Sequence, residues 1–122
     1  MTALARSRQE IEAARLLTGG GFAAQAISRA YYAAFYAAEQ ALATLGESRS
    51  KHSGVISTFG RRVVREGGLD EEAGRVLRSL FEQRNSADYG EAPASRDDAE
   101  HAIGDAEQFV DSVESWLAGG KS

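Results

Sequence analysis

The stretch that decides the fold is residues 22–45, which read FAAQAISRAYYAAFYAAEQALATL. Its larger apolar residues recur three and four positions apart, the spacing of one face of a helix, and alanine fills many of the other positions. This apolar face consists of Ile27, Tyr31, Ala34, Phe35, Ala38, Leu42 and Leu45. Such a helix would span roughly 35 Å, long enough to be the central helix of a bundle. Because Arg29 and Glu39 interrupt the apolar run, we predict a buried helix of a soluble protein and no membrane span.

The rest of the chain divides into segments that also have helical composition. Glycine clusters and the single proline separate them, and the predicted helices cover residues 3–17, 22–45, 52–66, 70–88 and 95–118. Asp70 and Ser95 are predicted N-caps, and Asp98 would complete a capping box with Ser95. Short connections predict an all-α fold, a five-helix antiparallel up-and-down bundle forming one domain over residues 1–122.

The composition excludes several kinds of site. The 122-residue chain has no cysteine, so disulfides, thiolate metal sites and cysteine nucleophiles are excluded. Two histidines, His52 and His101, are too few for a histidine-rich metal site, and the glycines at 19–21 lack the pattern of a phosphate-binding loop. We therefore expect no metal ion and no cofactor. With no secretory leader visible, we expect a cytoplasmic protein.

Charge is distributed unevenly around a formal net charge of −4. Residues 49–65 carry five basic residues and no acidic one, whereas residues 97–114 carry seven acidic residues and no lysine or arginine. For the basic segment, a solvated face and a binding surface are equally good interpretations. For the acidic segment a solvated face is the simpler interpretation, and partner docking is the alternative.

Two short groups of residues near these segments could take part in chemistry. Arg84 and Asp88 are four positions apart on the predicted helix 70–88, so we expect an ion pair, which taken alone is most simply structural. His52 lies in the loop sequence KHSG at 51–54 and is a candidate general acid or base. The simpler interpretation is that His52 or Ser53 caps a helix.

A third group lies on the central helix. Arg29, Tyr32 and Tyr36 are three and four positions apart and so share a face that differs from the apolar one. Arginine binds phosphate and tyrosine stacks on bases, so this face could contact RNA. The commoner role of such a face is packing or a dimer interface.

Three blocks of sequence, taken in order, resemble the HEPN-domain family. They are SRAYYAAFYAAE at 28–39, KHSGVI at 51–56 with Phe59 after it, and RNSADYG at 84–90, and the resemblance covers about residues 5–117. It implies a five-helix fold that is commonly dimeric. Many members of the family are metal-independent ribonucleases, several of them toxins paired with a small nucleotidyltransferase antitoxin, and others are non-catalytic.

The resemblance also implies site residues. The family's active motif is an arginine, then a polar residue, then a histidine four to six positions after the arginine. Arg84 and Asn85 match the first two positions, but Asp88, Tyr89 and Gly90 stand where the histidine is expected. The missing imidazole could come from His52 if its loop folds over Arg84. The candidate catalytic residues are therefore Arg84, Asn85, His52 and Tyr89, and the candidate substrate contacts are Arg29, Tyr32, Lys51 and Asp88.

Two functions remain open on this resemblance. The first is a toxin-like ribonuclease that acts as a homodimer, with two Arg84 side chains meeting across a two-fold axis and a minimal nucleotidyltransferase antitoxin as partner. The second is a non-catalytic module that binds RNA or a nucleotide. A third alternative is a structural adaptor that docks a partner on its acidic fifth helix.

Overall fold

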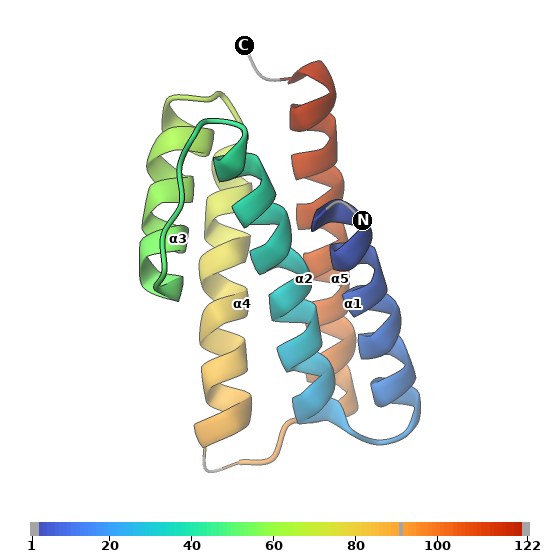
Figure 1. The fold of residues 1–122 in the computed structure, drawn as a ribbon. Coiled ribbons are helices and arrows are strands. Elements are labelled where there is room, and N and C mark those ends of the chain that lie inside the picture. Colours follow the sequence, from blue (N-terminus) through green and yellow to red (C-terminus); the bar gives the residue numbers. More distant parts are fainter. Residues whose placement is uncertain (1–2, 91, 121–122) are drawn as a thin grey trace.

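The computed structural model describes residues 3–90 and 92–120, and throughout these ranges its regular structure is helical (Figure 1). The predicted all-α, five-helix fold is confirmed. The elements are α1 (Ala3–Gly19), α2 (Ala23–Ala43), α3 (His52–Phe59), the π-helical segment η1 (Gly60–Arg65), α4 (Glu71–Tyr89), α5 (Arg96–Ser115) and the π-helical segment η2 (Trp116–Gly120). The predicted helices 52–66 and 95–118 thus each change from α to π geometry before they end.

Helix α2 is the central helix, as predicted. It contacts α1, α3, α4, α5 and η1, and seven of its eleven buried residues are alanines. Small side chains let neighbouring helices approach closely, so the large buried residues Ile27, Tyr31, Phe35 and Leu42 can fill the space between them. Leu45, which was predicted to belong to the same apolar face, lies beyond the end of α2 and is half-buried.

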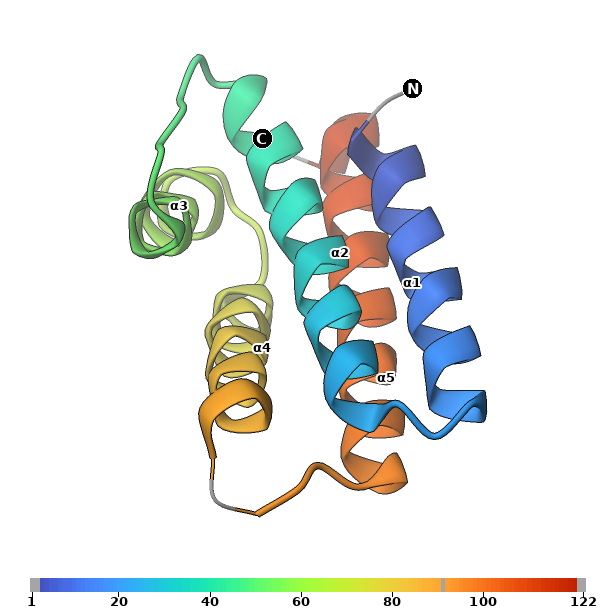
Figure 2. The same ribbon diagram turned by 60° about the horizontal axis from the view of Figure 1, so that its bottom comes forward.

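The connection between α2 and α3 departs from simple up-and-down order. Residues 44–51 run back along the bundle, so α3 points in the same direction as α2, whereas α1 and α2, α3 and α4, and α4 and α5 are antiparallel (Figures 1 and 2). Helix α2 ends where Gly46 adopts a left-handed φ of 73° and Glu47 N donates to Leu42 O at 3.0 Å. The return of the chain places the start of α3 beside the middle of α2.

Both predicted N-caps are confirmed. The Asp70 side chain accepts a hydrogen bond from Glu72 N at 3.0 Å at the start of α4. At the start of α5, Asp98 N donates to Ser95 Oγ at 3.0 Å and Ser95 N donates to the Asp98 carboxylate at 2.9 Å, which completes the predicted capping box.

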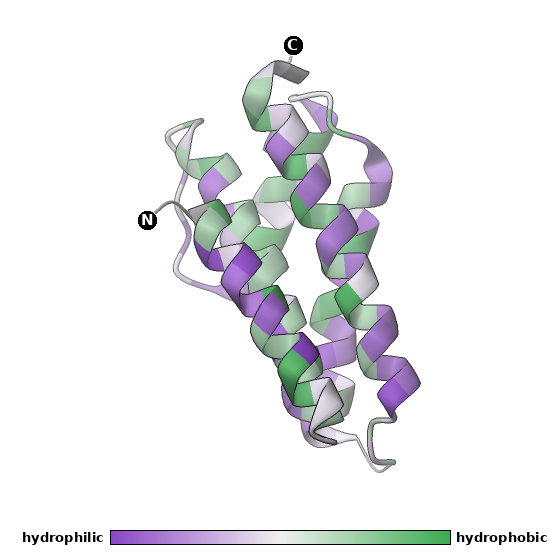
Figure 3. Cartoon of the chain, turned by 90° about the vertical axis from the view of Figure 1, so that its right-hand side faces the viewer, coloured by the Kyte–Doolittle hydropathy of each residue, from purple (hydrophilic) through white to green (hydrophobic). Residues whose placement is uncertain are grey.

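Acidic residues of α5 face arginines of α1. Arg8 pairs with Asp111 at 2.8 Å and with Glu114 at 3.2 Å, and Arg15 pairs with Glu107. Polar residues lie mainly on the outer sides of the helices (Figure 3). The acidic segment therefore helps to hold α1 against α5, which supports the solvated-face interpretation over partner docking.

In the part of the chain that the structure describes, no helix combines the length and the apolar character needed to cross a membrane.

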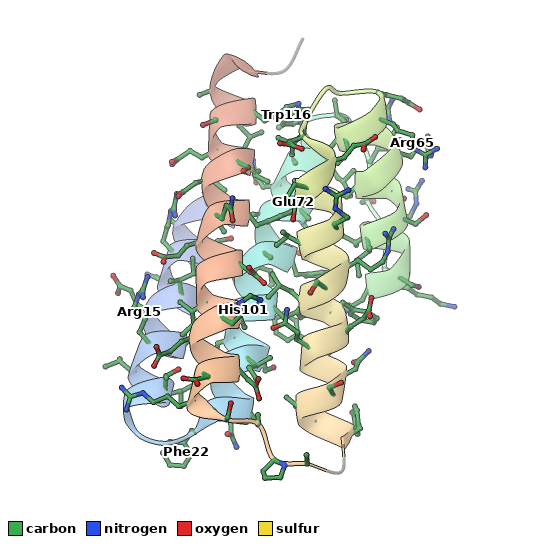
Figure 4. All side chains as sticks on the ribbon, turned by 180° about the vertical axis from the view of Figure 1, so that it is seen from behind. Arg15, Phe22, Arg65, Glu72, His101 and Trp116 are labelled. Atoms are coloured by element: carbon green, nitrogen blue, oxygen red, sulfur yellow. The ribbon has the colours of Figure 1, made fainter. Side chains whose placement is uncertain are left out.

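The start of η2 is joined to the turn between η1 and α4 by a contact that the sequence did not predict. Trp116 is 2% exposed, and its indole Nε1 donates to Gly67 O at 2.8 Å (Figure 4). A Cβ atom at Gly67 would lie 2.6 Å from Val63 O and 3.1 Å from Trp116 Cζ2, which is too close for any side chain. Glycine at position 67 thus allows this turn to pack against the tryptophan.

Candidate functional site

Aromatic side chains from α2, α3 and α4 meet around Tyr31. Tyr31 is fully buried, and its ring centroid lies 5.1 Å from that of Tyr32 and 5.7 Å from that of Phe81. We call this group the Tyr31 cluster, and its members are Tyr31, Tyr32, Phe35, His52, Phe81 and Arg84. It brings residues from all three sequence blocks to one place.

His52 enters the Tyr31 cluster because the connection 44–51 returns along the bundle. Its Nδ1 shares a hydrogen bond of 3.0 Å with the Tyr31 hydroxyl, and its ring centroid lies 4.3 Å from that of Phe35. Burial lowers the pKa of His52, and the positive charge of Arg84 lowers it further. The imidazole is therefore neutral near neutral pH, the form that can accept a proton.

The alternative role of His52 or Ser53 as a helix cap is wrong. Lys51 occupies the N-cap position of α3, and no side chain there makes a capping hydrogen bond within the described residues. His52 is the first residue of the helix, and its side chain turns toward α2 to meet Tyr31.

Arg84 reaches the Tyr31 cluster from α4. Its guanidinium carbon lies 5.5 Å from the ring centroid of Tyr31 and 5.4 Å from that of Tyr32, which is cation–π distance. Its Nε lies 3.6 Å from the Asp88 carboxylate, which confirms the predicted ion pair. Arg84 Nε is buried and donates no hydrogen bond within the described residues. The guanidinium has five N–H donors, so it keeps donors for an anionic ligand.

Tyr31 is the site residue that the sequence reasoning missed, because its spacing assigned it to the apolar face of α2. Burial raises the pKa of the Tyr31 hydroxyl above its ordinary value, with the charge of Arg84 opposing that effect, so the group stays protonated at neutral pH. A buried tyrosine usually needs a partner for its hydroxyl. That requirement was the one signal in the sequence that could have pointed to Tyr31.

The face formed by Arg29, Tyr32 and Tyr36 is divided between two environments. Arg29 donates to both carboxylate oxygens of Glu10 at 3.0 and 3.1 Å, and Tyr36 accepts from Arg6 at 2.8 Å. These contacts join α1 to α2, which supports the packing interpretation for Arg29 and Tyr36. Tyr32 differs, since its ring lies 5.7 Å from that of His52.

The remaining candidates are not members of the Tyr31 cluster. Asn85 follows Arg84 on α4 and is half-buried, while Tyr89, the last residue of α4, is 81% exposed. Lys51 is exposed next to His52. The structure thus brings Arg84, His52, Tyr32 and Asp88 together and leaves Tyr89 on the open surface.

Most of the arginines in the basic segment 49–65 are paired with acidic residues that lie just before or just after it in the chain. Arg62 pairs with Glu47 at 3.0 Å and with Glu66 at 2.9 Å. Arg49 also pairs with Glu47, at 3.1 Å, and Arg61 also pairs with Glu66, at 3.8 Å. Arg49, Arg61 and Arg62 thus form a partly solvated ion-pair network with Glu47 and Glu66. Arg65 and Lys51 are the cations of the segment that have no ion pair among the described residues, and both are exposed.

Among the residues of 3–90 and 92–120, no three or more histidine, aspartate or glutamate side chains are grouped so that they could hold a metal ion.

Comparison with known proteins gives consistent matches over nearly the whole chain. The family model of the HEPN domain matches residues 2–116. A UPF0332 protein of Thermotoga maritima is 36% identical over 113 residues, which is 92% of this chain and 86% of that protein. A protein of Methanocaldococcus jannaschii named "putative toxin" is 35% identical over 91% of this chain and 83% of its own length. A UPF0332 protein of Gloeobacter violaceus is 36% identical over 93% and 91%.

Proposed function

The chain belongs to the HEPN domain family, and from that premise we propose that it is a toxin-like HEPN protein that cleaves RNA without a metal ion. The observation that supports this proposal is that His52 and Arg84 both contact the ring of Tyr31, although no histidine stands at positions 88–90. A relative named as a putative toxin supports the biological role.

The chemistry follows from the two side chains. The RNA 2′-hydroxyl attacks the neighbouring phosphorus, so the 2′-oxygen–phosphorus bond forms and the bond to the 5′-oxygen breaks. His52 takes the proton of the 2′-hydroxyl, and the leaving 5′-oxygen takes a proton from solvent. Arg84 stabilises the negative charge that develops on the phosphate oxygens. The products are a 2′,3′-cyclic phosphate and a 5′-hydroxyl.

The hydrogen bond between His52 and Tyr31 bears on the state of the imidazole. In the tautomer that donates Nδ1–H to the Tyr31 oxygen, Nε2 is unprotonated and can act as the base. The Tyr31 hydroxyl stays protonated because burial raises its pKa, so it does not compete with His52 for the proton. Tyr31 is in this scheme a positioning residue.

We also propose that the active unit is a homodimer. Arg84 is already paired with Asp88 at 3.6 Å, so one guanidinium carries little net charge toward a phosphate. A second Arg84 across a two-fold axis would add a second set of guanidinium N–H donors for the phosphate oxygens at the cleft. The family resemblance further supports a minimal nucleotidyltransferase as the antitoxin that restrains this activity.

A second candidate function is a non-catalytic module that binds RNA or a nucleotide. The Arg84–Asp88 pair favours it, because the carboxylate partly neutralises the arginine that would stabilise the transition state. Replacing Asp88 with asparagine separates the two functions. If the protein cleaves RNA, Asp88→Asn should raise the cleavage rate, whereas a pure binding module should gain affinity for RNA and show no cleavage.

The proposal is tested by expression toxicity and RNA cleavage of the wild type and of Arg84→Ala. Arg75→Ala is the matched control, because Arg75 is also on α4 but is exposed and paired with Glu72. We expect toxicity and cleavage in the wild type and the control, and neither in Arg84→Ala. Clear nucleotide binding without cleavage by the wild type would favour the second function.

A further inference from the structure

A groove between α3, η1 and α4 opens beside the Tyr31 cluster. Its volume is about 430 Å³, and the polar and aromatic residues that line it include Ser53, Ser57, Arg65, Arg78, Phe81 and Glu82. Phe81 belongs to both places, since its ring centroid lies 5.7 Å from that of Tyr31 and 6.5 Å from that of His52. Ser53 directly follows His52 in the chain. The groove therefore begins where the candidate catalytic residues meet.

The arginines of this groove differ from the others in the chain. Of the twelve arginines, ten have an ion pair or a side-chain hydrogen bond: Arg6, Arg8, Arg15, Arg29, Arg49, Arg61, Arg62, Arg75, Arg84 and Arg96. The two without such a partner in the described ranges are Arg65 and Arg78, and both line this one groove. Both are exposed, and Arg65 projects from the end of η1 at the edge of the bundle (Figure 4).

We propose that this groove binds the phosphate backbone of a single-stranded RNA as the strand leads to Arg84. This inference rests on the proposed function and names the substrate class of the same site. Guanidinium groups bind phosphate oxygens through paired N–H donors. The hydroxyls of Ser53 and Ser57 add further donors, and a base can stack on Phe81.

The geometry of α4 lets one strand reach both the groove and the catalytic residues. Arg78 and Arg84 are six residues apart, or about 9 Å along the helix axis. Phe81 lies between them in the chain and offers an aromatic surface between two phosphate-binding positions. A poly-glutamate strand would use the two guanidinium groups but has no ring to stack on Phe81, whereas every base of an RNA strand has one, so the combination favours a nucleic acid strand. Glu82 also lines the groove, and its carboxylate opposes an anion there.

The test is binding of a short fluorescent single-stranded RNA, measured by anisotropy over a range of salt concentrations. For a single strand, each phosphate contact contributes about 0.7 to the steepness with which the logarithm of the binding constant falls with the logarithm of the salt concentration. The double variant Arg65→Gln/Arg78→Gln should therefore reduce this slope by about 1.4 and lose roughly tenfold in affinity near physiological salt. Glu82→Gln should bind more tightly. Arg75→Gln removes one positive charge from α4 outside the lining of the groove, where Arg75 is paired with Glu72, and should bind as the wild type does.

The outcomes separate this inference from the proposed function. If the double variant loses RNA binding but no protein cleaves RNA, the groove stands and the cleavage proposal fails. If cleavage depends on Arg84 while binding and cleavage are unchanged in the double variant, the proposal that the groove binds RNA is overturned and the cleavage proposal stands. Absence of RNA binding by the wild type, or equal competition by poly-glutamate, would also overturn the groove.

Discussion

Replacing Tyr31 with phenylalanine removes one hydroxyl from the Tyr31 cluster and leaves the ring in place. The hydroxyl lies 3.0 Å from His52 Nδ1 and is the polar group of α2 that holds the imidazole. The ring contacts with Tyr32, Phe35, Phe81 and the Arg84 guanidinium do not need the hydroxyl. The variant therefore isolates the hydrogen bond from the packing.

The size of the effect follows from what is lost. A neutral hydrogen bond inside a protein contributes about 1 kcal/mol to stability, and the smaller side chain leaves almost no cavity. The free energy of unfolding should therefore fall by about 1 kcal/mol. If the same bond orients the imidazole for proton transfer, a loss of about 1 kcal/mol in the transition state slows cleavage roughly fivefold.

The assay combines urea unfolding with single-turnover RNA cleavage. Tyr36→Phe is the matched control, because it removes a tyrosine hydroxyl from the same helix and breaks the 2.8 Å bond from Arg6, away from His52. We expect Tyr36→Phe to cleave RNA at the wild-type rate. The reasoning is refuted if folded Tyr31→Phe cleaves as fast as the wild type, or if both variants slow cleavage equally.

The other predictions concern the fold and its pH dependence. Gly67→Ala should destabilise the protein by about 1–3 kcal/mol in urea unfolding, because the new Cβ would lie 2.6 Å from Val63 O, whereas Gly104→Ala, with open space around position 104, should not. Equal stability of Gly67→Ala and the wild type would contradict this packing. His52 has a pKa lowered from about 6.5 by burial and then by Arg84, so the unfolded chain binds more protons below that pH. The free energy of unfolding should thus fall as the pH drops below about 6.5, and His52→Gln should remove that part of the pH dependence; an unchanged pH profile would contradict it.

The helices could be predicted because their signals are local. The apolar spacing of residues 22–45, the caps at Asp70 and Ser95, and the ion pair between Arg84 and Asp88 all depend on residues within about one helical turn of one another. Each is present in the structure.

What could not be predicted depends on residues far apart in the chain. The direction of the connection 44–51 is set by packing of α3 on α2 and α4, and no local pattern encodes it. The same connection decides that His52 meets Tyr31, 21 positions away, and not a residue near the end of α2. The bond from Trp116 to Gly67 spans 49 positions. For that reason the sequence predicted His52 as a partner of Arg84 only if the loop of His52 folds over Arg84. In the structure both side chains contact the ring of Tyr31.

The most direct test of the account is RNA cleavage by His52→Ala beside His101→Ala. The two variants remove the chain's two histidines in turn, and His101 is exposed on α5, where it pairs with Asp105. A general base contributes about 100-fold to 10,000-fold in rate. We predict that His52→Ala loses cleavage by at least the lower of these factors while His101→Ala retains the wild-type rate. Cleavage by folded His52→Ala at the wild-type rate would contradict the claim that His52 and Arg84 form one catalytic site.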